Sequence, residues 1–321
     1  MKIVFIVNPI AGGFDISEKL DQMLPEAAAR AGVAEYTVVR TEHPGHAREL
    51  AQKYGETGEE VRLYAVGGDG TFNEVISGAY QYKNVAVGCI PYGSGNDFLR
   101  NFGTREEFQD LTDQFSGVEM DIDLIQSGYG MCATICSAGL DAEIAYQIPM
   151  FRRLPFCGGE MAYRLSIVKR LMGRLGRKLS ITLDGYTQTE ECLLTAVCNG
   201  GYYGGGFCAA PESSMDDGLL DVVIVRKMPL LRIAKVLPLY QKGKHMMGGQ
   251  IVSELADVVE FHRCRSVEIR AADNTDKPIV VNVDGECREA AGIAAHVLPL
   301  GGRVILPAKV YARYAQHKET V

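Results

Sequence analysis

The most informative segment of the chain reads Val66-Gly67-Gly68-Asp69-Gly70-Thr71-Phe72-Asn73-Glu74. The apolar run before it is typical of a buried strand, and the residues after it are typical of a helix. Glycines at such a junction let the backbone approach a phosphate closely, and the helix N-terminus favours the anion. Asp69 suits this site when Mg²⁺ or a substrate hydroxyl lies between the two anions. The alternative is a plain turn in which Asp69 caps the helix.

Apolar runs alternate with helical stretches through the first 120 residues. We predict strands at 3–7, 36–39, 61–66 and 85–90, and helices at 16–31 and 44–54. This order predicts a parallel sheet covered by helices, whose ligand site lies beyond the carboxyl ends of the strands. Glycine-rich segments follow three of those ends, at 12–13, 67–70 and 93–95.

Two further loops are candidates for the walls of the same phosphate site. Pro91-Tyr92-Gly93-Ser94-Gly95-Asn96-Asp97-Phe98 comes directly after a predicted strand, and a capped loop is its alternative interpretation. Asn8-Pro9-Ile10-Ala11-Gly12-Gly13 follows the first strand, where an ordinary strand-to-helix turn is the alternative. Their common position at strand ends favours one site with three walls.

The pattern changes after about residue 121 to short β-rich runs with tight turns. Asp184-Gly185 and Asp284-Gly285 each follow an apolar run, which is a strong hairpin signal. Helical stretches are predicted at 160–175 and 230–242. The second half is therefore expected to be mostly antiparallel.

Composition excludes several classes of protein. The chain of 321 residues is 47% hydrophobic and 23% charged, which is typical of globular domains and excludes disordered and fibrous classes. Its formal net charge of −7 has the wrong sign for a protein that coats nucleic acid. The nine cysteines and six histidines show no metal-binding or disulfide spacing, so we expect reduced thiols, including core thiols at Cys132 and Cys136.

Neither a signal peptide nor a membrane span is indicated. Met1–Val7 is too short for a signal-peptide core and resembles a first strand. The longest uncharged run, residues 192–211, contains five glycines and Asn199, which argues against a helix in lipid. We expect a cytoplasmic protein that is soluble or lies on a membrane without crossing it.

Residues 151–178 form a basic, amphipathic stretch. It holds eight Lys or Arg residues against the single acid Glu160, so this segment carries +7 in a chain of net charge −7. Apolar residues are interleaved with the cations, which suits an anionic membrane surface. The alternative is a core-packed helix with a solvated charged face.

The motifs together resemble the catalytic domain of the diacylglycerol kinase family, in its soluble bacterial form. Five motifs match in order and spacing across essentially the whole chain: Asn-Pro-x-Ala-Gly at 8–12, Gly-Gly-Asp-Gly-Thr-x-Asn-Glu at 67–74, Gly-Ser-Gly-Asn-Asp-Phe at 93–98, Asp-Asp-Gly-Leu-Leu-Asp at 216–221 and Val-Asp-Gly-Glu at 283–286. Ser94 departs from the Thr that is more common in the family, but it keeps the hydroxyl.

The resemblance implies an α/β N-terminal domain with a parallel sheet, akin to NAD kinases and phosphofructokinases, and a C-terminal, mostly antiparallel β-sandwich domain. We expect the catalytic domain at residues 1–122 and 303–321, because the chain end returns to it in such kinases. Residues 123–302 would then form the lipid-substrate domain.

The resemblance also implies cofactors and their ligands. ATP and Mg²⁺ are the expected cofactors. Residues expected to hold ATP are Asn8, Thr41, Gly67, Gly68, Asp69, Gly70, Thr71, Phe72, Asn73, Gly93, Ser94, Gly95 and Asn96. The loop at 214–219 resembles the family's structural Mg²⁺ site, with the Asp217 carboxylate and the Ser214 and Leu219 carbonyls as ligands.

The sequence around Asp284 and Glu286 allows two interpretations of these acids. Asp284-Gly285 is a good hairpin turn, whereas two acids at i and i+2 of an extended segment would share one face, as a metal contact beside a general base requires. The resemblance favours the second interpretation, with Glu286 accepting the proton of the lipid hydroxyl and Asp284 supporting the metal and phosphate network. Asp69 is the competing candidate for the base.

The leading hypothesis is a kinase that transfers the ATP γ-phosphoryl group to a lipid hydroxyl, with diacylglycerol as first choice. Phosphatidylglycerol, a polyprenol and a sphingoid base are the other candidate substrates. An NAD kinase and a non-catalytic lipid- or nucleotide-binding regulator are the alternative functions. Expected partners are the lipid, an anionic membrane surface contacted peripherally and, as one option for the oligomeric state, a second copy in a homodimer.

Overall fold

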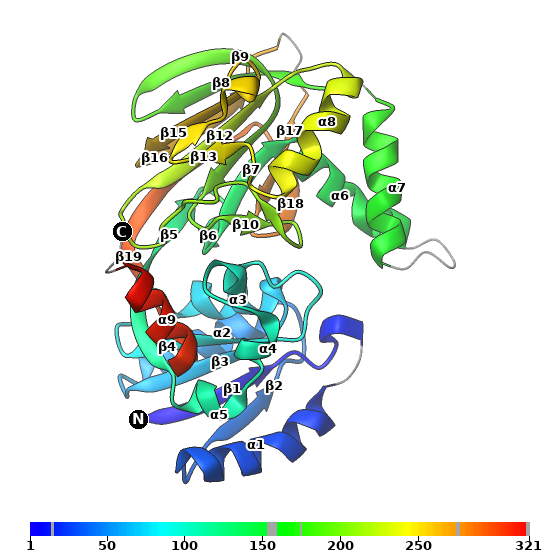
Figure 1. The fold of residues 1–321 in the computed structure, drawn as a ribbon. Helices are drawn as coiled ribbons and strands as arrows, with labels where there is room; N and C mark the ends of the chain where they lie inside the picture. Colours follow the sequence, from blue (N-terminus) through cyan, green and yellow to red (C-terminus); the bar gives the residue numbers. More distant parts are fainter. Residues whose placement is uncertain (14–15, 153–158, 174, 274–276, 319–321) are drawn as a thin grey trace. The chain divides into compact units, whose positions relative to one another are not determined.

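The computed structural model describes residues 1–13, 16–152, 159–173, 175–273 and 277–318. It divides into two compact units, which are described separately (Figure 1). Unit 1 comprises Met1–Leu124 and Pro299–Val321, and unit 2 comprises Ile125–Leu298. Unit 1 contains a parallel sheet with helices and unit 2 a mostly antiparallel sandwich, so the predicted fold class is confirmed.

The sheet of unit 1 has the strand order β2-β1-β3-β4-β19. All four neighbouring pairs are parallel, as the alternation of strands and helices predicts. The strands are β1 (Lys2–Val7), β2 (Thr37–Arg40), β3 (Val61–Gly67), β4 (Val85–Pro91) and the last part of β19 (Gly292–Leu306). The four predicted strands agree with these bounds to within one residue.

Helices cover both faces of this sheet (Figure 1). Helices α1 (Ser17–Ala31) and α5 (Leu111–Phe115) pack on the face that holds the stacked rings of Phe5 and Tyr64, whose centroids lie 5.1 Å apart. Helices α2 (His46–Glu56) and α3 (Asp69–Ala79) lie on the other face. Unit 1 also contains η1 (Ala11–Gly13), η2 (Phe98–Asn101), α4 (Arg105–Phe108) and α9 (Ala308–Lys318).

Unit 2 is built from antiparallel strands. The long strand β9 (Tyr186–Cys198) pairs with β8 through residues 186–192 and with both β7 and β12 through residues 194–198. The other long strands are β7 (Ile135–Gly139), β8 (Arg177–Leu183), β12 (Leu220–Arg226), β15 (Val259–Cys264), β16 (Ser266–Ala271), β17 (Ile279–Val283) and β18 (Glu286–Ala290). Short elements complete it: β6 (Gly130–Cys132), β10 (Tyr202–Tyr203), β11 (Phe207–Cys208), β13 (Met246–Met247), β14 (Gln250–Ile251) and η3 (Ser253–Leu255). Strand β5 (Val118–Ser127) runs from unit 1 into unit 2, and β19 runs back.

Both predicted hairpin turns are present. Asp184-Gly185 joins β8 to β9 and Asp284-Gly285 joins β17 to β18. All four residues have positive φ, which Asp and Gly tolerate and which the favoured two-residue hairpin turns require. Cys132 and Cys136 are fully buried, as expected for core thiols.

The sandwich has two apolar layers that alternate along its strands. In β12, Val222 and Ile224 belong to one apolar cluster, on one face of the sheet, and Val223 and Val225 belong to a second cluster, on the opposite face. We call this second cluster the helix layer. The helix layer receives α8 (Leu230–Gln241) and the start of α6 (Leu140–Arg152). Figure 1 shows these helices with α7 (Gly159–Leu171) at the same side of the sandwich.

Helix α6 has no counterpart among the predicted helices, and α7 ends at 171 rather than at the predicted 175. Helix α6 contains Pro149 and has a weak apolar period, so neither helix signal is clear in its sequence. Among the described residues, no helix is long and apolar enough to cross a membrane.

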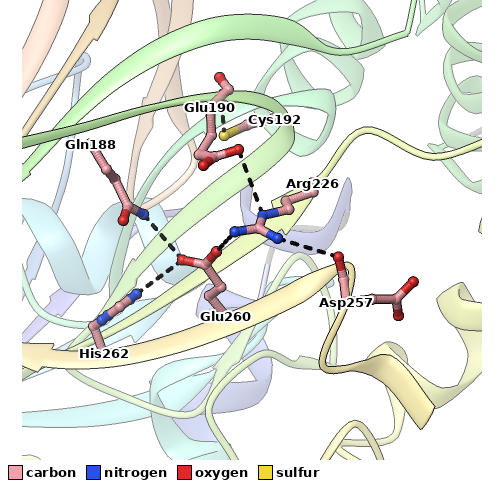
Figure 2. Close-up of polar contacts among 7 residues, drawn as sticks. All are labelled: Gln188, Glu190, Cys192, Arg226, Asp257, Glu260 and His262. Atoms are coloured by element: carbon pink, nitrogen blue, oxygen red, sulfur yellow. Dashed lines mark hydrogen bonds and ion pairs between the residues drawn. The ribbon is translucent and has the colours of Figure 1, made fainter. Parts of the chain in front are cut away.

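A charged network ties three strands of unit 2 together (Figure 2). Arg226 of β12 pairs with Glu260 of β15 and lies 3.7 Å from the carboxylate of Glu190 of β9. Glu260 also accepts from Gln188 Nε2 at 3.1 Å and contacts His262 Nε2 at 3.2 Å. Burial raises the pKa of Glu260, but these hydrogen bonds and the Arg226 charge outweigh burial and lower it overall. The network is a cross-strand structural feature.

Candidate active site

Four loops of unit 1 leave the sheet at the carboxyl ends of adjacent parallel strands, where ligands bind in such folds. They follow β1, β2, β3 and β4, and these loops, with the end of β3 and the first residues of α3, contain every residue that the sequence analysis assigns to ATP binding. The structure therefore brings Asn8, Thr41, the segment 67–73 and the segment 93–96 to one edge of one sheet.

The Asp69 carboxylate links two of these loops. Its two oxygens accept the backbone N–H groups of Asn96 and Asp97, each at 2.6 Å. The residue at the cap position of α3 is Gly68, and Asp69 lies within the first turn, so the alternative of Asp69 as a helix cap is wrong. Asp69 instead fixes the position of the loop after β4 against the start of α3.

The loops also meet backbone to backbone. A Cβ on Gly93 would lie 2.4 Å from the Cα of Gly68, so a side chain has no room between the two loops. A Cβ on Gly12, whose φ is +70°, would lie 2.4 Å from the carbonyl oxygen of Tyr92. Gly67 accepts the N–H groups of Tyr92 and Gly93 at 2.7 and 3.0 Å. These contacts place the glycine-rich backbones of three loops side by side.

The remaining loops are joined to α3 by side chains. Asn8 Nδ2 donates to the Thr71 hydroxyl at 3.1 Å, so the loop after β1 is bound to the helix start. Glu74 accepts the N–H groups of Gly45 and Ala47 at 2.9 and 3.2 Å, which binds the start of α2 to α3. The Thr41 N–H donates to the Val7 carbonyl at 2.8 Å and thereby aligns the loop after β2.

The predicted ATP ligands range from exposed to buried. Gly70 and Ser94 are exposed, and the first turn of a helix leaves N–H groups without partners inside the helix. Thr71, Phe72, Asn73 and Asn96 are buried, and Phe72 stacks on Phe98 with ring centroids 4.1 Å apart. The exposed group can contact a phosphate directly, whereas Phe72 serves packing beneath the loops.

Asp97 and Glu74 are site residues that the sequence analysis quoted in its motifs but left out of its list. A Cβ on Gly95 would lie 2.4 Å from one Asp69 carboxylate oxygen and 3.7 Å from one of Asp97, so both acids lie beside the same glycine. The signal was available in the sequence as a second acid in the 93–98 motif. That Asp97 lies close to Asp69, which precedes it by 28 residues, is seen only in the folded structure.

In unit 2, Asp284 has a dense set of hydrogen bonds. Its carboxylate accepts the N–H groups of Ala133, Thr134 and Ile135, at 2.6 to 3.4 Å, and the Thr134 hydroxyl. Its φ of +43° puts it in a left-handed turn, so Asp284 and Glu286 do not lie in one extended segment as expected. Glu286 begins β18 and is exposed. Asp284 thus fixes the turn from which Glu286 projects.

The loop at 214–219 is held by hydrogen bonds within itself. The Asp217 carboxylate is exposed and accepts the Leu219 N–H at 3.0 Å, and the Ser214 hydroxyl donates to Asp216 at 2.7 Å. Burial raises the pKa of the neighbouring Asp221 to about 6, and the negative charge of Asp217 adds to this against the opposing Arg263 charge. Carboxylate and carbonyl oxygens in an electronegative loop suit Mg²⁺.

The glycine-rich loops and acids at the strand ends define unit 1 as the nucleotide-binding domain of a phosphotransferase. Family comparisons agree: residues 2–127 match the diacylglycerol kinase catalytic domain, and residues 134–306 match the YegS C-terminal NAD kinase beta sandwich-like domain. The chain belongs to the diacylglycerol kinase family, and it is an ATP-dependent lipid kinase.

Relatives support this assignment. The chain is 30% identical over 284 residues to a diacylglycerol kinase of Bacillus subtilis (strain 168), with 88% of each chain covered. It is 26% identical over 287 residues to a diacylglycerol kinase of Staphylococcus carnosus (strain TM300), covering 88% of this chain and 87% of the relative. A solved diacylglycerol kinase structure from Bacillus anthracis str. Sterne shares the fold, with a TM-score of 0.68, 20% identity and coverage of 96% and 98%.

Proposed function

We propose that this lipid kinase phosphorylates diacylglycerol, forming phosphatidic acid from the γ-phosphoryl group of ATP. The observation that supports this most strongly is the arrangement of the loops after β3 and β4, which the Asp69 carboxylate and the Gly68–Gly93 contact hold together, with the loop after β1 joined to α3 through Asn8 and Thr71. It accompanies a similarity to curated diacylglycerol kinases over 88% of the chain.

In this proposal the loops of unit 1 bind ATP. Backbone N–H groups of the first turn of α3 and the Ser94 hydroxyl donate to phosphate oxygens, and Asn8 and Thr41 line the same edge of the sheet. Catalysis then relies on positioning and electrostatic stabilisation of the transferred group. Loops that are already held by Asp69 lose little freedom when the nucleotide binds.

We propose Glu286 as the general base. Asp69 is the weaker candidate, because both of its oxygens already accept backbone N–H groups. Glu286 is exposed and lies beside a turn that Asp284 fixes with its hydrogen bonds to residues 133–135. A carboxylate on a rigid turn suits proton transfer from a bound hydroxyl.

We propose that Mg²⁺ binds at two places. Asp69 and Asp97, beside Gly95, would hold the ion that accompanies ATP, where it would neutralise charge on the phosphates. The Asp217 carboxylate, with the Ser214 and Leu219 carbonyls, would hold a structural ion in the 214–219 loop. The negative charges of Glu212 and Asp217 near Asp221 favour a cation at this loop.

We also propose a peripheral contact with an anionic membrane surface, made mainly by apolar residues of unit 2. Met172, after α7, is 85% exposed and Leu231 of α8 is 83% exposed. Two cations of the basic stretch are engaged inside the unit: Arg170 pairs with Glu143, and Arg177 pairs with Asp273 at 2.8 Å. Arg153 and Arg174 lie outside the described residues.

A kinase assay across a lipid panel tests the function. Purified protein is incubated with labelled Mg²⁺·ATP and mixed micelles of diacylglycerol, phosphatidylglycerol, a polyprenol or a sphingoid base, and with NAD. The proposal expects labelled phosphatidic acid as the main product. Preferential labelling of NAD would support the NAD-kinase alternative, and no labelling of any acceptor would support a non-catalytic regulator. Sedimentation of the same preparation tests whether the protein forms a homodimer.

A further inference from the structure

Asn282 is a buried polar residue of β17 that the proposed mechanism does not use. It is 6% exposed, and in register it lies opposite Ser137 of β7 on one side and Cys287 of β18 on the other. The neighbouring residues Val281 and Val283 belong to the apolar core of unit 2. Successive side chains of a strand point to opposite faces, so Asn282 lies on the face away from that core. A buried amide is destabilising unless hydrogen bonds satisfy it.

The Asn282 side chain joins β7 to the turn after β17. Its Oδ1 accepts the backbone N–H of Gly285 at 2.8 Å, and the Cys287 thiol donates to the same oxygen at 3.6 Å. Its Nδ2 donates to the hydroxyl of Ser137, which is fully buried, at 3.5 Å. The amide is therefore bonded at both ends, and its acceptor is used on the residue that precedes Glu286.

The turn that receives this bond has positive φ at both residues, +43° at Asp284 and +93° at Gly285. A residue other than glycine keeps this conformation only where its surroundings hold it. Two side chains hold the turn. The Asp284 carboxylate accepts N–H groups of residues 133–135, and the Asp284 N–H donates to the Ile135 carbonyl at 3.0 Å. Asn282 supplies the acceptor for Gly285.

The position of Glu286 follows from the geometry of this turn, because Glu286 is the next residue and the first of β18. It is exposed, so little packing holds its side chain. Proton transfer needs the two heavy atoms within about 2.6–3.2 Å of each other. A displacement of about 1 Å can lower a rate about 100-fold. A contact that fixes the turn therefore affects the reaction.

We propose that Asn282 is a positioning residue for the general base: its amide holds the Gly285 N–H and thereby fixes the position from which Glu286 reaches the lipid hydroxyl. This inference rests on the proposed function, with Glu286 as the base. It extends the site to a residue inside the sheet that lies outside the 283–286 motif.

A double-mutant cycle tests whether Asn282 acts through Glu286. Asn282→Leu removes the acceptor and keeps a similar side-chain shape, and Glu286→Gln removes the base. With Mg²⁺·ATP and the acceptor that the lipid panel labels, we expect kcat to fall at least about tenfold in Asn282→Leu and at least about 100-fold in Glu286→Gln. The KM for ATP should stay within about twofold in both, since the loops of unit 1 bind ATP. In the double variant, kcat should lie less than about threefold below that of Glu286→Gln alone.

Two further variants serve as controls. Asn282→Asp keeps an acceptor oxygen for the Gly285 N–H, so it should retain at least about a third of the wild-type kcat at pH 8. Gln188→Met removes another amide of unit 2, which donates to Glu260 at 3.1 Å from the part of β9 that pairs with β8. Its kcat should equal that of wild-type protein.

Native-state hydrogen exchange gives a second readout that needs no turnover. The Gly285 amide should exchange at least about tenfold faster in Asn282→Leu than in wild-type protein, and at the wild-type rate in Gln188→Met. If Asn282→Leu does not fold, Asn282→Ala removes the same acceptor without placing a large apolar side chain there, and the same results are expected.

An unchanged exchange rate at Gly285 would overturn the proposal. So would a loss of kcat by the same factor with and without Glu286, because Asn282 would then be a structural residue only. Near-normal turnover of Glu286→Gln would instead refute the assignment of the base, and that result is obtained from the single variant. The exchange measurement remains decisive if no lipid in the panel is phosphorylated.

Discussion

The carboxylate of Asp69 accepts the backbone N–H of Asp97 at 2.6 Å, across 28 residues of sequence. One side chain therefore determines how the loop after β4 lies against the first turn of α3. The geometry of the proposed phosphate site in unit 1 depends on this contact and on its counterpart from Asn96.

Replacing Asp69 tests that dependence. Asp69→Asn puts an amide NH₂ group where two backbone N–H groups need acceptors, and it removes a charge from the phosphoryl-transfer site. We expect kcat to fall by about 10² to 10⁴, since one positioned charge contributes roughly 3–5 kcal/mol. The matched control is Asp110→Asn in the same unit, where Asp110 caps α5. It should cost up to about 1 kcal/mol of stability and leave kcat intact. Near-normal turnover of Asp69→Asn would exclude both the metal role and the loop-positioning role.

Gly93→Ala tests the backbone contact between the loops. The new Cβ would lie 2.4 Å from the Cα of Gly68, so the two loops must separate. We expect the KM for ATP to rise at least tenfold in steady-state assays. Gly128→Ala serves as control, because a Cβ at Gly128 meets nothing within 4 Å. An unchanged KM for ATP in Gly93→Ala would contradict the assignment of this loop to the nucleotide.

The proposed Mg²⁺ site in the 214–219 loop leads to a prediction about thermal stability. If it holds Mg²⁺, adding the ion raises the melting temperature of wild-type protein, because binding to the folded state alone stabilises it by mass action. Asp217→Ala should abolish that rise, whereas Asp257→Ala, an exposed acid elsewhere in unit 2, should retain it. Calorimetric scans with and without Mg²⁺ decide the matter. A full Mg²⁺ response in Asp217→Ala would remove the loop from the list of metal sites.

Membrane binding should depend on apolar side chains more than on paired cations. The double variant Met172→Ser, Leu231→Ser should lower binding to anionic vesicles about tenfold in flotation assays and leave thermal stability unchanged, since both side chains are exposed. Arg177→Gln should instead destabilise unit 2 by about 1–3 kcal/mol, because it breaks the two-bond contact with Asp273. Normal vesicle binding by the double variant would refute this surface.

The low pKa of Glu107 leads to a prediction about the stability of unit 1 in acid. Its hydrogen bond with Arg313 of α9, followed by that with the Thr104 N–H, lowers its pKa to about 2. Because the pKa is lower in the folded state, this stabilisation is present above the unfolded pKa near 4.5 and is lost as the pH falls toward 2. Glu107→Gln should lower the free energy of unfolding by about 1 kcal/mol at pH 7, a figure reduced for solvent screening. Urea titrations at pH 7 and pH 2.5 should show this difference shrinking. A constant difference would contradict it.

The sequence predicted the fold well where local signals are strong. The turns at Asp184-Gly185 and Asp284-Gly285 need positive φ at both positions, and few residue pairs tolerate that. The parallel strands follow from their buried apolar runs. Helix α6 was missed because Pro149 interrupts a helix whose apolar period is already weak.

The candidate site could be predicted only in part, because its residues come together through contacts between distant parts of the chain. Glycine-rich motifs at strand ends identify phosphate loops, but the partners of Asp69 lie 27 and 28 residues away and become neighbours only through the parallel pairing of β3 and β4. The same holds for Arg177, which is part of the predicted membrane stretch and pairs with Asp273, 96 residues later. An ion pair between residues far apart in the chain produces no periodic pattern in a single sequence.

The return of the chain to unit 1 has a consequence for biosynthesis. Strand β4 pairs with β19 through Val87 and Val304, and β19 is made only after the whole of unit 2. At ribosomal rates of about 5–20 residues per second, the 174 residues from Ile125 to Leu298 take roughly 9–35 s to synthesise. For that time β4 has an open edge on a nascent polypeptide, which is a hazard for aggregation. We expect the growing chain to need protection by chaperones at this edge, and a stop codon before residue 304 to yield insoluble protein.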